Sequence, residues 1–137
     1  MKTGKELTLE WFQRVWNNCE HDAIFDLMSE ECEIHGLNLQ KRGASGFAQF
    51  HTAYCKAFEN IHIEVFEMAE ENGLVIGHAR FTAKHKKSNN DVDMVFSLSV
   101  RWQDGKAIEA RDVVDFTTML SQIGAFDMRV LADAIES

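Results

Sequence analysis

The segment VDMVFSLSVRWQDGKAIEARDVVDF, residues 92–116, decides the fold. Its first part alternates apolar and other residues, a period of two that predicts a long strand with one buried face. The apolar positions are Val92, Met94, Phe96, Leu98, Val100 and Trp102. The turn at residues 103–106 has Asp-Gly at its centre and is typical of a tight hairpin. A last strand over residues 107–116 is therefore expected to return antiparallel to the first.

Two earlier segments show the same period of two. A strand begins at residue 61, Glu-Glu-Asn-Gly at residues 70–73 indicates a turn, and a second strand covers residues 74–86. The sequence thus predicts four consecutive antiparallel strands. In the 74–86 strand, the more apolar face is expected to point inward and carries Val75, Gly77, Ala79, Phe81 and Ala83. The opposite orientation would bury Arg80 beside Ile76 and His78.

Helical periodicity precedes the sheet. Residues 9–28 repeat apolar side chains at steps of three and four, with a break at Asn17-Asn18. A long helix over residues 43–58 carries an aromatic stripe of Phe47, Phe50, Tyr54 and Phe58, and a short strand is expected at residues 32–35. After the sheet, Asp115 is expected to cap a short helix and Asp127 a final helix that runs through residue 135.

This order of elements predicts an α+β fold, with the N-terminal helices on one face of a curved, mostly antiparallel sheet. Such a sheet closed by helices encloses a conical cavity, which is a natural site for a small molecule. No linker, repeat or low-complexity segment interrupts the chain, so a single domain over residues 1–137 is expected.

Composition excludes several classes of function. The 137 residues are 45% hydrophobic and 26% charged, which is typical of a globular protein. The net charge of −8 argues against binding to nucleic acid or to an anionic membrane. No apolar run is long enough to span a bilayer, and the first residues lack the apolar core of a signal peptide. Three cysteines without a CxxC pair favour free thiols and a cytoplasmic location.

Asp112 is the most informative residue of the last strand. Alternation places it on one face with Ile108, Ala110, Val114 and Phe116, which are all apolar. Burying an ionised carboxylate is costly, so Asp112 is expected to have a raised pKa or a charged partner. A carboxylate of raised pKa can carry a proton near neutral pH. A structural pair with Arg80 or a histidine is the alternative.

Other candidates for chemistry are few. His35 stands at the end of a short strand, where site residues are common, and Arg80 would need an anion if it were buried. The histidines form no HxH, HxxxH or HExxH pattern, so no metal is expected. No Gly-rich phosphate loop of the required spacing and no Gly-x-Ser-x-Gly elbow occurs, and no cofactor is expected.

The layout, with DGKAIEARDVVDF at residues 104–116 and LSQIG at residues 120–124, resembles the nuclear transport factor 2-like superfamily, and within it the SnoaL-like polyketide cyclase group. The resemblance implies a cystatin-like cone with a pocket and a homodimer formed through the sheet. In that group the Asp that corresponds to Asp112 is the acid and base of an intramolecular aldol closure. Residues that assist this Asp in relatives are replaced here by Leu98 and Thr82.

The functional hypothesis is a cofactor-independent enzyme that uses acid/base chemistry, of aldol cyclase or isomerase type, on a small apolar carbonyl compound. Asp112 would move the proton, and His35 or Arg80 would orient or polarise the oxygen. The pocket that binds the substrate would be lined by Trp16, Phe50, Tyr54, Phe96 and Leu98. The alternative, favoured by Leu98 and Thr82, is a non-catalytic module that binds a small ligand or mediates dimerisation.

Overall fold

The computed structural model describes residues 1–137. In chain order the elements are α1 (Gly4–Trp11), the π-helical η1 (Phe12–Asn17), α2 (Ala23–Leu27), β1 (Met28–His35), α3 (Gly43–Ala57), β2 (Phe58–Glu71), β3 (Leu74–His85), β4 (Asn90–Gln103), β5 (Lys106–Val114), α4 (Phe116–Gln122) and α5 (Met128–Glu136). This order matches the predicted succession of helices, a strand, a long helix and four strands.

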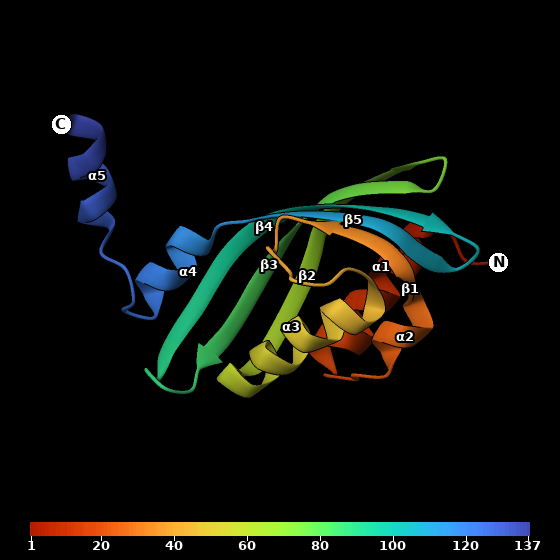
Figure 1. Ribbon diagram of the computed structural model, residues 1–137, viewed down its shortest axis with the longest axis horizontal. Coiled ribbons are helices and arrows are strands. Elements are labelled where there is room, and N and C mark those ends of the chain that lie inside the picture. The colour runs from red at the N-terminus through yellow and green to blue at the C-terminus, as the bar shows by residue number, and fades with distance from the viewer.

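The five strands form one sheet in the order β1-β5-β4-β3-β2. Neighbours from β2 to β5 are antiparallel, as predicted, and β1 is parallel to β5. The α1, α2 and α3 helices cover one face of the curved sheet, whereas α4 lies at its end (Figure 1). The α+β fold with helices on one face of a mostly antiparallel sheet is therefore confirmed.

The hydrophobic core lies between that face and the helices, and the orientation of β3 decides which of its residues contribute. Val75, Ala79, Phe81 and Ala83 are buried in the core. The more apolar face of β3 thus points inward, as the sequence predicts, and the intervening side chains lie on the outer face of the sheet. Arg80 belongs to this outer face and is exposed.

The N-terminal helix starts earlier than residue 9 because a capping box fixes its first turn. The Glu6 backbone N–H donates to Thr3 Oγ1 at 3.1 Å, and the Thr3 N–H donates to the Glu6 carboxylate at 3.4 Å. These two bonds satisfy N–H groups that would otherwise have no partner at the helix start. The helical run ends at Asn17, where the predicted break occurs.

The last strand contains a β-bulge that the alternation of residues does not reveal. Arg101 pairs with Glu109, but Trp102 pairs with Ala107, so Ile108 is the extra residue on β5. As a result Ala107 is buried in the core. The prediction that Ile108 shares the inner face with Asp112 was wrong for this reason, whereas Ala110 and Val114 keep the predicted phase.

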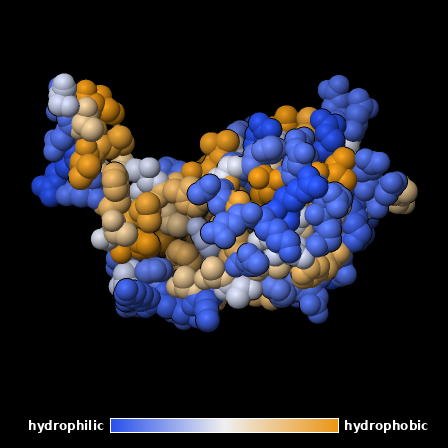
Figure 2. Space-filling model, viewed as in Figure 1, coloured by the Kyte–Doolittle hydropathy of each residue, from blue (hydrophilic) through white to orange (hydrophobic).

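The last two helices begin as predicted. The Asp115 side chain accepts a hydrogen bond from Thr118 N, and that of Asp127 accepts one from Arg129 N, so both residues are N-caps. No residue of α5 is buried. This helix stands away from the rest of the molecule, and hydrophobic side chains lie on its surface (Figures 1 and 2). None of the helices has the length and apolar character required to cross a membrane.

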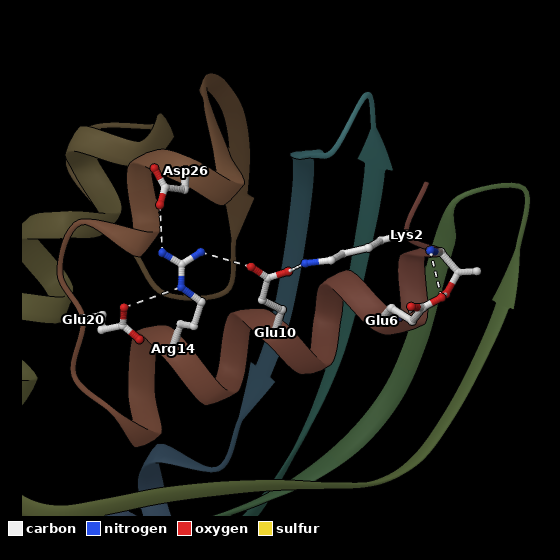
Figure 3. Close-up of polar contacts among 7 residues, drawn as sticks. Lys2, Glu6, Glu10, Arg14, Glu20 and Asp26 are labelled. Atoms are coloured by element: carbon white, nitrogen blue, oxygen red, sulfur yellow. Dashed lines mark hydrogen bonds and ion pairs between the residues drawn. The ribbon is translucent and has the colours of Figure 1, made fainter.

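Arg14 joins η1 to α2 through a cluster of carboxylates (Figure 3). Its guanidinium lies 2.8 Å from Asp26 Oδ2, 3.0 Å from Glu10 Oε2 and 3.6 Å from Glu20 Oε1. Hydrogen bonds to Asp26 and then to Glu10 raise the pKa of Arg14 above its usual range. The cluster therefore connects η1 with α2 and with the loop between them.

Candidate active site

An apolar pocket lies between the sheet and the helices. Including its open mouth, it has an empty volume of ≈ 800 Å³. Of its 22 lining residues, 20 are hydrophobic, so an apolar ligand would be favoured. The space-filling view shows hydrophobic side chains gathered in a hollow beside α4 (Figure 2).

Aromatic side chains from η1 and α3 form one wall of the pocket. The rings of Phe50 and Tyr54 are stacked with centroids 4.3 Å apart, and Trp16 meets them edge-on at 6.2 and 6.1 Å. Phe96 and Leu98 of β4 line the pocket as well. The structure thus brings together the five side chains that the sequence proposed for substrate binding.

Asp112 of β5 lines the same pocket, opposite Leu98 in the antiparallel register. The other lining residues apart from Thr8 are hydrophobic, and loss of water around the carboxyl group raises the pKa of Asp112 to about 7. No ion pair neutralises it, so the alternative of a structural pair with Arg80 or a histidine is not what the structure contains. At neutral pH a carboxyl group of this kind exists in both its protonated and ionised forms.

The other polar groups of the pocket wall differ in their freedom to bind a ligand. The Thr8 hydroxyl is occupied, because it donates to the Gly4 carbonyl at 2.8 Å and accepts from Trp102 Nε1 at 3.0 Å. The Tyr54 hydroxyl has only a long contact of 3.9 Å with Met119 Sδ. Burial raises the pKa of Tyr54, so this hydroxyl stays protonated and available as a donor.

Gly36 is a site residue that sequence reasoning missed. It follows β1 with a φ of 93°, and a Cβ placed there would stand 1.8 Å from the Asp112 carbonyl oxygen. Only glycine allows this approach of the two backbones. The sequence signal was the glycine itself, immediately after a short strand, but nothing in the sequence pairs that strand with β5.

Arg80 does not act in the pocket, which corrects one prediction. Its Nε donates to Asp93 Oδ1 at 2.8 Å, across from β3 to β4 on the outer face of the sheet. The hydrogen bonds that Arg80 donates to the Asp93 carboxylate raise the pKa of Arg80. Because the inward face of β3 is filled by small and apolar residues, Arg80 cannot reach Asp112.

His35 is also outside the pocket, so the prediction that it orients a substrate oxygen beside Asp112 does not agree with the structure. Its Nε2 lies 3.3 Å from Glu109 Oε2 and 3.9 Å from Glu33 Oε2. One ligand atom from each of these three residues lies within 4.8 Å of the others, a set that could hold a divalent cation. Sequence motifs made of histidines alone could not reveal this set, because its other two members, Glu33 and Glu109, are carboxylates on different strands.

A cone-shaped fold with an apolar pocket and one unpaired carboxylate is typical of proteins that bind small molecules. Comparison with known proteins identifies the family. The model of the SnoaL-like polyketide cyclase family matches residues 6–123. The chain belongs to this family. No curated protein sequence matches the chain.

Solved structures share the fold at low sequence identity. AclR from Streptomyces galilaeus, a suggested hydroxylase, has 21% identity and a TM-score of 0.79, covering 90% of this chain and 97% of its own. A suggested polyketide cyclase from Bacillus cereus ATCC 10987 has 20% identity and a TM-score of 0.79, covering 88% and 80%. A protein of ketosteroid isomerase-like fold from Catenulispora acidiphila DSM 44928, solved in complex with trimethylamine, has 13% identity and a TM-score of 0.76, covering 90% and 95%. At such identities the likeness concerns the fold alone.

Proposed function

We propose that the protein is a cofactor-independent enzyme that catalyses proton transfer next to the carbonyl group of a small apolar compound, as in an aldol cyclisation or an isomerisation. The observation that carries this proposal is the unpaired Asp112 carboxyl group in a pocket where 20 of 22 lining residues are hydrophobic. Membership of the SnoaL-like polyketide cyclase family supports the same type of substrate.

Asp112 alone can serve as both base and acid in these proton transfers, because the proton that it takes in the first step is returned in the last. The ionised carboxylate takes a proton from the carbon next to the carbonyl, which leaves an enolate and a neutral Asp112. In a cyclisation the enolate carbon then bonds to a second carbonyl carbon of the same molecule. The new alkoxide takes the proton back from Asp112, so the carboxylate is regenerated and the product is an isomer of the substrate.

The negative charge of the enolate oxygen needs a donor in this dry pocket. Tyr54 has the role that the sequence gave to His35 or Arg80, because its hydroxyl is on the pocket wall and makes only a long sulfur contact. The aromatic and aliphatic wall of Trp16, Phe50, Phe96 and Leu98 holds the apolar body of the substrate.

Hydrogen–deuterium exchange tests the first proton step without knowledge of the natural substrate. The protein is incubated with 2-tetralone, an apolar ketone, in deuterated buffer, and loss of the proton next to the carbonyl is followed by NMR. The wild type is expected to exchange it faster than buffer, Asp112→Asn at the buffer rate, and Tyr54→Phe at an intermediate rate. Asp104→Asn, in an exposed turn, is the matched control and should exchange like the wild type.

A second function is favoured by the absence of any other charged side chain from the pocket wall. In this alternative the protein binds a small apolar molecule, or dimerises, without catalysis. Native mass spectrometry of the purified protein discriminates the two, because a retained small molecule that is released unchanged supports binding alone. Binding of 2-tetralone with equal exchange in wild type and Asp112→Asn would also favour this alternative.

The homodimer and the cytoplasmic location are parts of the same proposal. Apolar side chains lie exposed on the outer face of the sheet, with Phe66 at 53%, Ile76 at 54%, Val95 at 52% and Val113 at 68%. We call these four residues the outer patch. A second copy packed face to face would cover the outer patch. Three free thiols are compatible with a reducing compartment such as the cytoplasm.

A further inference from the structure

Two cysteines that are distant in sequence meet beside the aromatic wall of the pocket. Cys19 lies in the loop after η1, Cys55 lies near the end of α3, and their Sγ atoms are 3.4 Å apart although 36 positions separate them. A disulfide bond is about 2.05 Å long, so the sulfurs need to approach by only about 1.4 Å. Cys19 is exposed and Cys55 is half-buried.

The surroundings give the two thiols different reactivity. Loss of water and the neighbouring Cys19 raise the pKa of Cys55 to about 12, so its thiol is protonated near neutral pH. Cys19 is exposed and is therefore the thiol that a small disulfide in solution can reach. The third cysteine, Cys32, is buried in the core, where loss of water raises its pKa to about 12.

His51 lies next to the pair and its protonation is fixed by its contacts. Its Nε2 is 2.6 Å from the Val15 carbonyl oxygen, which can only accept, so this nitrogen carries a hydrogen. The same nitrogen is 3.4 Å from Cys55 Sγ. Its one hydrogen is used by the Val15 carbonyl, so His51 packs against Cys55 and is not placed to act as a base for it.

We infer that Cys19 and Cys55 are a reversible modification site, a dithiol that a small disulfide such as glutathione disulfide converts into an intramolecular disulfide. In the first step Cys19 sulfur attacks one sulfur of glutathione disulfide, which breaks that S–S bond, forms a mixed disulfide and releases one glutathione. In the second step Cys55 sulfur attacks the Cys19 sulfur and releases the second glutathione. The two cysteines lose two protons and two electrons, and glutathione disulfide gains them.

The disulfide would connect two elements that form the pocket wall. Cys19 Sγ contacts the Trp16 carbonyl oxygen at 3.5 Å, and Cys55 follows Tyr54 directly in α3. Oxidation would therefore hold the end of η1 against α3 and restrict the freedom of Trp16 relative to Tyr54. Formation of the disulfide does not depend on the proposed catalysis, so the two hypotheses can fail separately.

The test uses the folded, reduced protein and excess glutathione disulfide, followed by alkylation and mass spectrometry. The number of thiols that can be alkylated after unfolding is expected to fall from three to one, and the Cys19 and Cys55 peptides should be linked within one chain. Dithiothreitol should restore all three. The oxidised protein should unfold at a temperature about 5–10 °C higher, since the bond closes a long loop.

Two variants separate the pair from the remaining thiol. Cys32→Ser should form the same link as the wild type. Cys19→Ser should form no disulfide and should keep Cys55 free of glutathione. The proposal is overturned if Cys19 accumulates glutathione without reaction of Cys55, if the link joins two chains, or if it includes Cys32.

Discussion

Gly36 and Asp112 are in backbone contact: a Cβ at Gly36 would stand 1.8 Å from the Asp112 carbonyl oxygen. The contact occurs where β1 ends beside β5, after the paired residues His35 and Arg111. The backbone that carries the only carboxylate in the pocket is therefore supported by a position where no side chain fits. A side chain at position 36 would therefore displace the backbone that carries Asp112.

Replacement of Gly36 by alanine should destabilise the protein and displace Asp112. Gly105 provides a matched control, because its φ of 80° is similar to the 93° of Gly36 but nothing lies within 4 Å of its Cβ position. Both variants place alanine at a positive φ, which costs about 1–2 kcal/mol. Gly36→Ala adds the collision with β5, so we expect a loss of about 2 kcal/mol or more beyond that of Gly105→Ala in urea unfolding. Equal losses of stability in the two variants would show that the β5 backbone moves away from an alanine at position 36 without cost.

The position of Asp112 could be predicted from sequence, but its neighbours could not. Alternation within a strand depends on local pleating, so it placed Asp112 on the inner face and Val75 and Phe81 of β3 in the core. The β-bulge at Ile108 and the parallel pairing of β1 depend on contacts between distant segments. Gly36 becomes informative only after that pairing is known.

The two errors at the site have different origins. Alternation in β3 already favoured an outward Arg80, and the structure places it on the outer face beside Asp93. His35 was proposed for its place at the end of a strand, and only the pairing of β1 with β5 shows that it lies beside Glu109. The proximity of Cys19 and Cys55 was likewise inaccessible, because it depends on how η1 packs against α3. Periodicity therefore predicts which face a residue occupies, and tertiary packing decides which residues meet.

Asp112→Asn should increase stability more at high pH than at low pH. The pKa of Asp112 is raised from 3.8 to about 7, so the folded protein holds its proton over a range where the unfolded chain has lost it. Stability from this group is greatest below the unfolded value, falls as pH rises between the two values, and changes no further above about 7. Asp112→Asn does not show this decrease in stability, because asparagine does not ionise. Its free energy of unfolding relative to the wild type should rise by about 2–3 kcal/mol between about pH 5 and about pH 8.

The comparison across pH removes the effect of burying an amide, because that effect is the same at both values. Asp104→Asn in the exposed β4–β5 turn is the control and should show no such rise. Urea unfolding of the three proteins at both pH values provides the measurement. A constant difference between wild type and Asp112→Asn would mean that the carboxyl group is ionised throughout the range and is not desolvated.

A charge on the outer patch should dissociate the proposed dimer. Val113 is 68% exposed on β5, and a lysine there would place two charges in a face-to-face interface of two copies. We expect the wild type to sediment as a dimer and Val113→Lys as a monomer. Val130→Lys, on the exposed α5 where the native side chain is 58% exposed, should remain dimeric. A monomeric wild type, or three dimers, would rule out this interface.

Thr8→Val should destabilise the protein because it removes the partner of a buried indole. The Thr8 hydroxyl accepts from Trp102 Nε1 at 3.0 Å, and the Thr8 side chain is 1% exposed. Valine has almost the same shape but leaves that N–H unpaired, at a cost of about 1–3 kcal/mol in urea unfolding. Thr8→Ser keeps the hydroxyl and should lose less stability.

The decisive comparison is with Trp102→Phe, which removes the indole donor. In the Trp102→Phe background, Thr8→Val should lower the free energy of unfolding by almost nothing further. If its cost is the same with and without Trp102, the hydroxyl stabilises the helix through the Gly4 carbonyl rather than the wall of the pocket.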